Sequence, residues 1–414
     1  MHIKVRLKKA AQEAWHTIAL ALIRALVFRK ISLHGEPLPK RGQPILYLGF
    51  HKNGAVDGWV YKIALSRPVE FMVATKLMSN PLARIFFSGI EVTRRDDSGS
   101  SASNRHGLQT AVSLLQQGGS LFIFPEGTST LGHQHLEFMK GAALIASNAL
   151  TVRSDLIVLP LSVYYATPQQ WGGIAEVVVG PAITLSDLKE EGDKPLNTQA
   201  IHQKIALSLD TLDPGFASEA DQQLANELAL LATLDDALPF STALDSARNL
   251  LNSDAAKQWR SFKGECTECA GWNNLPLFPH NSTAVQIAVF FFSGTAVIAS
   301  ALLNPIPLLA GVYAGRRFPD GPNVVLLWKS LSGISLFILL SPFTWLTLYY
   351  FGFQITWAIL LHSLITLLGC KNIETFKKSA VSLWNALRHK NRYDKFKHVR
   401  KAVCDEVIAK HAYS

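Results

Sequence analysis

The sequence predicts an α/β fold, in which helices flank a sheet, followed by transmembrane helices in the C-terminal third. Between residues 31 and 185, short apolar runs alternate with segments of helical periodicity, which is the pattern of an α/β sheet. Beyond residue 282, two long zones contain almost no charged side chains, which is typical of membrane helices. A histidine that follows one predicted strand, with an aspartate six positions later, marks the predicted active edge of the sheet.

The composition indicates a protein that works at a membrane. The 414 residues allow one large or two ordinary domains, and 48% of them are hydrophobic. A net charge of +9 suits either nucleic acid or an anionic lipid surface. Because the basic residues flank apolar segments, we expect the lipid bilayer to be the partner and expect no nucleic-acid binding.

The four cysteines predict no metal site. Cys266 and Cys269 form a single CxxC, whereas Cys370 and Cys404 lie far apart and lack the second pair of a zinc ribbon. His280 could join the first pair, but reduced thiols are the favoured interpretation. This composition fits a reducing compartment that faces the cytoplasm.

The order of these patterns divides the chain into five expected parts. Residues 1–30 are expected to form an amphipathic membrane-interface helix, because Trp15, Ile18 and Leu22 recur at helical spacing behind a basic start. The alternative is a helix packed on the protein's own domain. The other parts are an α/β domain (31–185), a helical insert or linker (186–282), a transmembrane region (283–369) and a basic cytoplasmic tail (370–414).

The α/β domain has a predicted alternation of elements. The expected strands are residues 31–34, 45–50, 70–74, 91–93, 120–124, 156–165 and 175–179. The expected helices are residues 58–65, 81–87, 105–117 and 136–150. In such folds the active groups lie on loops at the strand ends, where His51 and Glu126 are placed.

The membrane region has two apolar zones. Residues 283–303 are free of charge over the length that crosses a hydrocarbon core of about 30 Å. Residues 331–369 are free of acidic and basic residues except His362, and the zone is too long for one straight helix. The number of crossings stays open. The basic tail places both termini, and with them the catalytic domain, on the cytoplasmic side.

His51 and Asp57 are the candidate catalytic pair. An imidazole takes a proton from a hydroxyl near neutral pH, and a carboxylate on its other nitrogen fixes the tautomer. Because no serine or cysteine nucleophile motif accompanies the pair, the attacking oxygen is expected to belong to the substrate. The alternative is a loop histidine and a capping aspartate with no joint role.

Two further clusters predict substrate binding, the first through cations that suit an anion and the second through a carboxylate that can hold a substrate hydroxyl. Lys76 follows one strand and Arg94, with Arg95, follows another, so that two cations can converge on one phosphate. In LFIFPEGTST, Pro125 ends a buried strand, and Gly127 lets the backbone approach a ligand while Glu126 points into the same space.

Together these residues resemble the glycerol-phosphate acyltransferase family over about residues 40–185. The family's first block is a histidine and an aspartate, here His51 and Asp57, and its second is a glycine and an arginine, here Gly89 and Arg94. The third is a Phe-Pro-Glu-Gly block, here residues 124–127, and the fourth is a proline in an apolar strand, here Pro160. Four blocks in this order are highly specific.

The sequence departs from the commonest family pattern in two places. Five residues separate His51 from Asp57, where the family usually has four, and Ser129 stands where an arginine often follows the third block. The longer spacing resembles a branch with fungal-type glycerol-3-phosphate and dihydroxyacetone-phosphate acyltransferases and many bacterial relatives.

The resemblance implies an integral membrane O-acyltransferase of phospholipid biosynthesis, with residues 31–185 as its acyltransferase domain. It implies transfer of a fatty acyl group from acyl-CoA or acyl carrier protein, as co-substrate and with no cofactor, to glycerol 3-phosphate or lysophosphatidic acid. Together with the strand-end position of Lys76, it gives Lys76, Arg94, Glu126, Gly127 and Thr128 as the residues expected in substrate binding. The alternatives are an acyltransferase or transacylase for another lysolipid, a non-catalytic lipid-binding relative, and a DNA-binding membrane protein.

Overall fold

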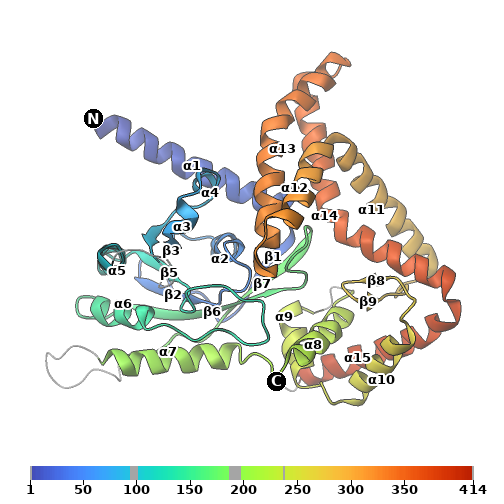
Figure 1. Ribbon diagram of the computed structural model, residues 1–414, viewed down its shortest axis with the longest axis horizontal. Helices are drawn as coiled ribbons and strands as arrows, with labels where there is room; N and C mark the ends of the chain where they lie inside the picture. Colours follow the sequence, from blue (N-terminus) through green and yellow to red (C-terminus); the bar gives the residue numbers. More distant parts are fainter. Residues whose placement is uncertain (1, 94–100, 186–196, 236–237, 413–414) are drawn as a thin grey trace.

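The computed structural model describes residues 2–93, 101–185, 197–235 and 238–412 (Figure 1). Its centre is a seven-stranded sheet in which only β6 and β7 pair antiparallel. In spatial order the strands are β1 (Phe28–Gly35), β7 (Gly173–Val179), β6 (Ile157–Tyr165), β2 (Ile45–Gly49), β5 (Ser120–Ile123), β3 (Glu70–Ala74) and β4 (Ile90–Val92). The predicted α/β fold is therefore confirmed.

Alternate residues of the central strands face two different cores. In β2, Tyr47 packs with α2 (Val56–Leu65) on one face, whereas Leu46 and Leu48 pack with α5 (Ser101–Gln116) and α6 (Gly141–Leu150) on the other. Every residue of β2 is buried, as expected of a central strand covered on both faces. Between β3 and β4 lie two short helices, α3 (Thr75–Met78) and α4 (Pro81–Phe86).

The catalytic layer extends past the expected boundary at residue 185. Helix α7 (Thr198–Leu212) packs Ile201, Ile205 and Leu209 into the same core as α5 and α6. Helix α6 begins five residues later than expected, at Gly141, because the preceding segment is held as a loop. In that loop the Met139 backbone N–H donates to the Pro125 carbonyl at 2.8 Å.

Helix α1 (His2–Leu26) packs on the protein's own domain through its second half. Ala19 and Ile23 are buried in the core with α2, and the Trp15 indole donates to the Ile85 carbonyl of α4 at 2.9 Å. Ile18, beside these residues on α1, is 52% exposed. The alternative of a helix packed on the domain therefore describes part of α1, and contact of its exposed side with lipid stays a prediction.

A second unit combines the insert with the C-terminal tail. Helices α8 (Glu219–Ala232), α9 (Phe240–Arg248) and α10 (Asp254–Glu265) and the hairpin β8–β9 (Gly271–Trp272, Leu275–Pro276) share one core. Helix α15 (Lys390–Ala412) completes it with Phe396, Val399, Val403 and Val407. The basic tail is thus a helix packed on the insert (Figure 1).

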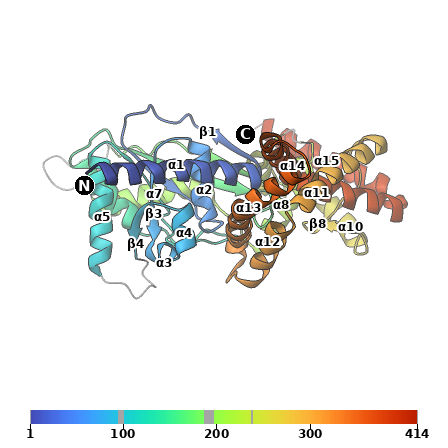
Figure 2. The same ribbon diagram turned by 90° about the horizontal axis from the view of Figure 1, so that it is seen from above.

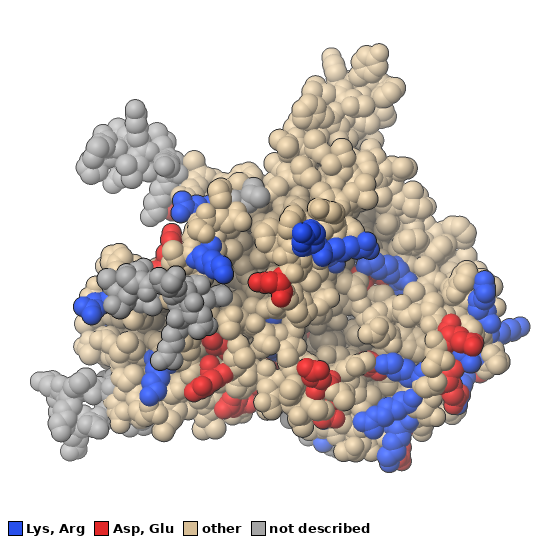
Figure 3. Space-filling model, in the orientation of Figure 1, with Lys and Arg blue, Asp and Glu red and all other residues tan. Residues whose placement is uncertain are grey.

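The apolar zones form a bundle of α11 (Thr283–Leu303), α12 (Pro305–Arg317), α13 (Val325–Tyr350) and α14 (Ile355–Arg388). Within the described residues, three segments are long and apolar enough to cross a membrane: α11, α14 and residues 322–350, which contain α13. The protruding ends of α13 and α14 show no charged side chain (Figure 3). Seen from above, α12 and α13 lie nearer the central sheet, and α11 and α14 lie on the side of α10 and α15 (Figure 2). The long zone 331–369 is divided between α13 and α14 by the turn that follows Tyr350.

Candidate active site

The candidate site lies at the carboxyl edge of the parallel strands. His51 follows β2, Glu126 follows β5 and Tyr165 ends β6, and these three strands are adjacent in the sheet. Because β5, β2 and β6 run parallel, their carboxyl ends meet at one edge. The topology therefore gathers side chains that lie up to 114 positions apart in the sequence, from His51 to Tyr165.

The structure brings His51 and Asp57 into contact. The His51 Nδ1 atom lies 2.9 Å from Asp57 Oδ2. Asp57 lies in the first turn of α2, and the chain turns back to it through Gly54, whose φ is +56°. His51 is 6% exposed and Asp57 is fully buried, so the contact is shielded from water.

Two further donors hold the Asp57 carboxylate. The backbone N–H of Asn53 donates to Oδ2 at 2.8 Å, and the Tyr165 hydroxyl donates to Oδ1 at 2.5 Å. Burial, together with the charge of Asp57, raises the pKa of the Tyr165 phenol, so the phenol stays protonated as a donor. Neither Asn53 nor Tyr165 carried a signal in the sequence, because a hydrogen bond between distant strands leaves no local pattern.

Contacts on one nitrogen and on one face orient the imidazole of His51, and its second nitrogen stays without a hydrogen bond among the described residues. Its ring stacks on Phe124, with 4.1 Å between the ring centroids. Because a carboxylate only accepts hydrogen bonds, the proton sits on Nδ1 and Nε2 keeps its lone pair. Within the described part of the chain, Nε2 makes no hydrogen bond, so it is available to take a proton from a ligand.

Glu126 ties together the two loops that border the site. Its Oε1 accepts the backbone N–H of His51 at 2.7 Å, and its Oε2 accepts that of Leu136 at 3.1 Å. Burial raises the pKa of Glu126, and the two backbone donors oppose that shift. Glu126 is therefore seen fixing the backbone of His51, a role that the sequence interpretation did not include.

Three other expected binding residues, Lys76, Gly127 and Thr128, border the same edge. Lys76, in α3, is exposed, and it follows β3, which pairs with β5 on the side away from β2. Gly127 adopts a φ of +72°, and Thr128 after it is exposed. Arg94 lies outside the described residues, beyond β4, which ends at Val92 beside Ala74 of β3.

A cavity of about 390 Å³ adjoins the site between the sheet and helices α8 and α9. Lys52, the residue after His51, lines this cavity and donates a hydrogen bond to Asp213. Asp213 also accepts a hydrogen bond from Arg248 at 2.9 Å. Burial favours the neutral form of Asp213, but the attraction of Lys52 and Arg248 outweighs it and lowers the pKa of Asp213.

The membrane helices contact the catalytic loops directly. The Asn323 amide, just before α13, donates to the Ser129 carbonyl at 3.0 Å, and a Cβ on Gly54 would lie 3.0 Å from the Asn323 carbonyl oxygen. Trp171, in the β6–β7 connection, fills a notch at Gly311 of α12, where a Cβ would meet its ring at 2.2 Å. The bundle is therefore packed against the loops that carry the candidate pair.

The cysteines stand as free thiols, and the described residues contain no group of three His, Cys, Asp or Glu side chains that could hold a metal ion. His280 instead approaches Asp235 at 3.4 Å.

Comparison with known proteins points to one family. Residues 30–164 match the family model described as Acyltransferase. A 1-acyl-sn-glycerol-3-phosphate acyltransferase of Chlamydomonas reinhardtii is 31% identical over 126 residues, which are 30% of this chain and 36% of the relative. A chloroplastic 1-acyl-sn-glycerol-3-phosphate acyltransferase of Arabidopsis thaliana is 28% identical over 145 residues, 34% of this chain and 38% of the relative. The chain thus spans little more than a third of the curated relatives it matches.

Proposed function

We propose that this chain, whose residues 30–164 match the Acyltransferase family model, is a membrane O-acyltransferase of the glycerol-phosphate acyltransferase family that esterifies a glycerol-phosphate acceptor. The acceptor is lysophosphatidic acid or glycerol 3-phosphate, and the donor is an acyl thioester of coenzyme A or of acyl carrier protein. The observation that carries the proposal is the buried pair of His51 and Asp57, with Nε2 left open, beside an apolar helix bundle. The relatives' names favour lysophosphatidic acid.

The proposed chemistry needs only one base. The acceptor hydroxyl gives its proton to His51 Nε2 while its oxygen attacks the thioester carbonyl. When the tetrahedral intermediate collapses, the carbon–sulfur bond breaks and the imidazolium returns the proton to the leaving thiolate. The products are an ester and a free thiol, and His51 is regenerated. Asp57 stabilises the imidazolium, and general-base help of this kind is typically worth about 10²–10⁴ in rate.

The proposed acceptor site lies along the strand ends beside His51. We assign the acceptor phosphate to Lys76 and Arg94, because cations on neighbouring strand ends can grip it together. Strand β3 is two positions from β2, about 10 Å at the usual spacing of strands, which a glycerol phosphate and a lysine side chain can bridge. Gly127 and Thr128 would border the glycerol backbone, with Glu126 holding their loop against His51.

The bundle suits a substrate with an acyl chain. At about 0.8 kcal/mol per methylene, moving a chain of about sixteen carbons into water costs on the order of 12 kcal/mol. A site packed against membrane helices avoids most of that cost. We place the catalytic domain on the cytoplasmic side, where acyl thioesters are made and where reduced thiols persist.

An acceptor panel tests the proposal. The full chain in phospholipid nanodiscs is given radiolabelled palmitoyl-CoA or palmitoyl-acyl carrier protein, with lysophosphatidic acid, glycerol 3-phosphate or lysophosphatidylcholine as acceptor. We expect ester formation with a phosphate-monoester acceptor and its loss in His51→Ala. Acceptor binding without transfer from either donor would instead identify a non-catalytic lipid-binding protein. Equal use of lysophosphatidylcholine would contradict a phosphate-monoester acceptor.

A further inference from the structure

The CxxC motif of the sequence lies outside the candidate active site, where the insert meets the C-terminal helices. Cys266 caps the C-terminal end of α10, and Cys269 stands just before the β8–β9 hairpin. Both are free thiols, and the proposed acyl transfer uses neither of them. Cys266 is 4% exposed, whereas Cys269 is partly exposed. Of the two, Cys269 is therefore the thiol that a reagent in solution meets first.

The turn between the two cysteines holds their side chains together. The backbone N–H of Cys269 donates to the Cys266 carbonyl at 3.0 Å. Such a bond closes a reverse turn, in which the first and fourth Cα atoms lie less than about 7 Å apart, and a disulfide needs about 4.4–6.8 Å. Burial, together with a hydrogen bond to Cys269, raises the pKa of the Cys266 thiol to about 12. Cys266 thus keeps its proton and donates it to the Cys269 sulfur.

A guanidinium faces the sulfur of Cys269. Arg392, in the first turn of α15, donates an N–H to Cys269 Sγ at 3.5 Å. The thiolate is the form of cysteine that attacks a disulfide, and a cation beside the sulfur stabilises its negative charge. Glu265, the residue before Cys266, is bonded to Lys395 of α15 at 2.5 Å, so its charge is met by a different cation.

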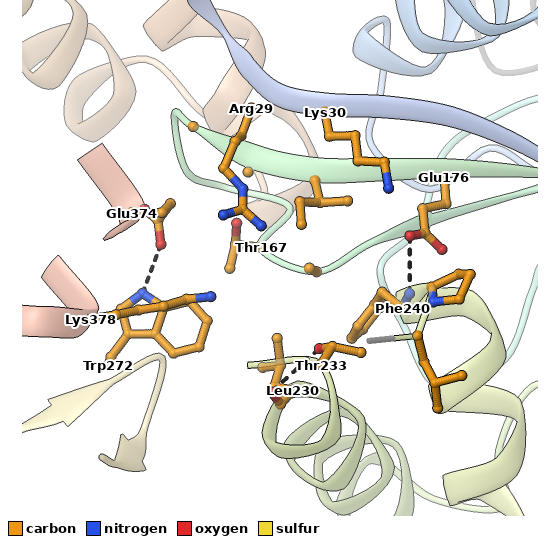
Figure 4. Close-up of a pocket in the computed structure, with 16 residues that line it drawn as sticks. Arg29, Lys30, Thr167, Glu176, Leu230, Thr233, Phe240, Trp272, Glu374 and Lys378 are labelled. Carbon is orange, nitrogen blue, oxygen red and sulfur yellow. Dashed lines mark hydrogen bonds between the residues drawn. The ribbon is translucent and has the colours of Figure 1, made fainter. Parts of the chain in front are cut away.

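Both sides of the CxxC turn are anchored. The side chain of Cys266 belongs to the core that the insert shares with α15. The residue after the motif, Ala270, exchanges two hydrogen bonds of 2.8 Å with the Asn385 side chain of α14. Two residues farther on, the Trp272 indole donates to Glu374 of α14 at 2.7 Å (Figure 4). Because both ends of the turn are held, the two thiols stay adjacent and react with each other at a high effective concentration.

We propose that Cys266 and Cys269 form a thiol–disulfide exchange site that takes small-molecule disulfides as its substrates, with Cys269 as the attacking thiol. The site goes beyond the proposed acyl transfer and does not depend on it. The disulfide that forms closes the turn between α10 and the β8–β9 hairpin covalently, next to α14 and α15.

The exchange proceeds in two balanced steps. The Cys269 thiolate, beside the Arg392 guanidinium, attacks one sulfur of the small disulfide and releases one thiol. The mixed disulfide carries no negative charge, so one cause of the raised pKa of Cys266 disappears. Cys266 then loses its proton, attacks the Cys269 sulfur and releases the second thiol. Two protein thiols are oxidised to one disulfide, the small disulfide is reduced to two thiols, and the two cysteine protons end on those thiols.

The test is thiol mapping on the full chain in neutral detergent. Reduced protein is incubated with hydroxyethyl disulfide, an uncharged probe, then quenched with acid, unfolded, alkylated with iodoacetamide and digested for mass spectrometry. We expect Cys266 and Cys269 to be recovered as one intramolecular disulfide, and Cys370 and Cys404 as alkylated thiols. Recovery of all four as alkylated thiols would overturn the proposal, as would adducts that form on Cys370 or Cys404 as fast as on Cys269. This map needs no substitution, so it stands even if a variant does not fold.

Variants assign the roles of the two thiols and of the guanidinium. In Cys266→Ala the reaction should stop at a mixed disulfide on Cys269, because the second thiol is gone. Cys269→Ala should slow the reaction at least about tenfold, because buried thiols are inert. Arg392→Gln should lower the rate constant several-fold, whereas Lys401→Gln, which removes the same charge from an exposed position of α15, should not. A Cys269→Ala protein as fast as the wild type would contradict the assignment of Cys269, and equal rates in Arg392→Gln and Lys401→Gln would contradict that of Arg392.

Discussion

Replacing Asp57 by asparagine should reduce kcat about 10³-fold while the protein stays folded. The carboxylate and the imidazole are in contact, with 2.9 Å between Oδ2 and Nδ1, so their charge centres are about 4 Å apart once the ring is protonated. With an effective dielectric constant of about 20, that attraction is about 4 kcal/mol, or about 10³ in rate at 1.36 kcal/mol per tenfold. The asparagine amide keeps the shape and an acceptor for His51 but loses the charge that stabilises the imidazolium.

The assay for Asp57→Asn is thiol release during acyl transfer in nanodiscs, with kcat and KM measured separately. Because Asp57 is fully buried behind His51, KM should change less than about threefold. Asp155→Asn, an exposed carboxylate paired with Arg153 at 2.8 Å, is the matched control and should leave kcat unchanged. If folded Asp57→Asn protein kept more than a tenth of the kcat, the electrostatic role of this carboxylate would be refuted.

Three smaller changes test the support of the site. Tyr165→Phe removes the 2.5 Å donor to buried Asp57 and should lower the free energy of unfolding by about 1.5–3 kcal/mol in denaturant titrations; an unchanged value would mean that water replaces the hydroxyl. Burial raises the pKa of Asp213, but the attraction of Lys52 lowers it more, so the pKa in the folded protein is below the ordinary value of 3.8. The ionised Asp213 carboxylate therefore stabilises the fold above pH 3.8, and this stabilisation is lost as the pH falls through the pKa of the folded state. The Tm gap between wild type and Asp213→Asn should therefore narrow below about pH 4, and a constant gap would contradict the ion pair. Trp171→Ala removes the ring that packs against Gly311 of α12 and should lower the free energy of unfolding by up to about 3 kcal/mol. A Tm equal to that of the wild type would show that this contact does not stabilise the protein.

The sheet was predictable because its signals are local. Strand β3, Glu70–Ala74, has the bounds that were predicted, and the central strands β2, β5 and β6 differ from their expected bounds by one residue at one end. Helix α11 likewise spans the predicted uncharged stretch, Thr283–Leu303. A strand that is buried on both faces needs a continuous apolar run, and a helix in a hydrocarbon core needs a long stretch without charge. Both requirements can be recognised in the local sequence.

The supporting shell of the site was not predictable, because its contacts join distant segments. In the sequence, Tyr165 is one of several large residues in a buried strand. Its hydroxyl donates to Asp57 only because β6 pairs with β2 in the sheet. Glu126 was recognised by its motif, yet its two bonds join segments that the sequence does not show to be close: one to the His51 N–H, and one to the Leu136 N–H in a loop that was predicted to be helix. The long His51–Asp57 spacing still leaves the family branch a prediction.

The packing of the bundle against the candidate-site loops fixes the position of the candidate pair relative to the helices that could cross a membrane. Asn323, in the turn just before α13, donates to Ser129, and the next residue, Thr130, donates its N–H to the His51 carbonyl at 2.9 Å. Two hydrogen bonds therefore connect the start of α13 to the backbone of His51. A flexible tether would let the pair drift along the membrane normal. A drift that left two more methylenes of an acyl chain in water would cost about 1.6 kcal/mol, about a 15-fold loss of bound substrate. In the proposed reaction, a rigid contact between bundle and loops would therefore act by holding the pair at one depth, although no residue of the bundle takes part in the proposed chemistry.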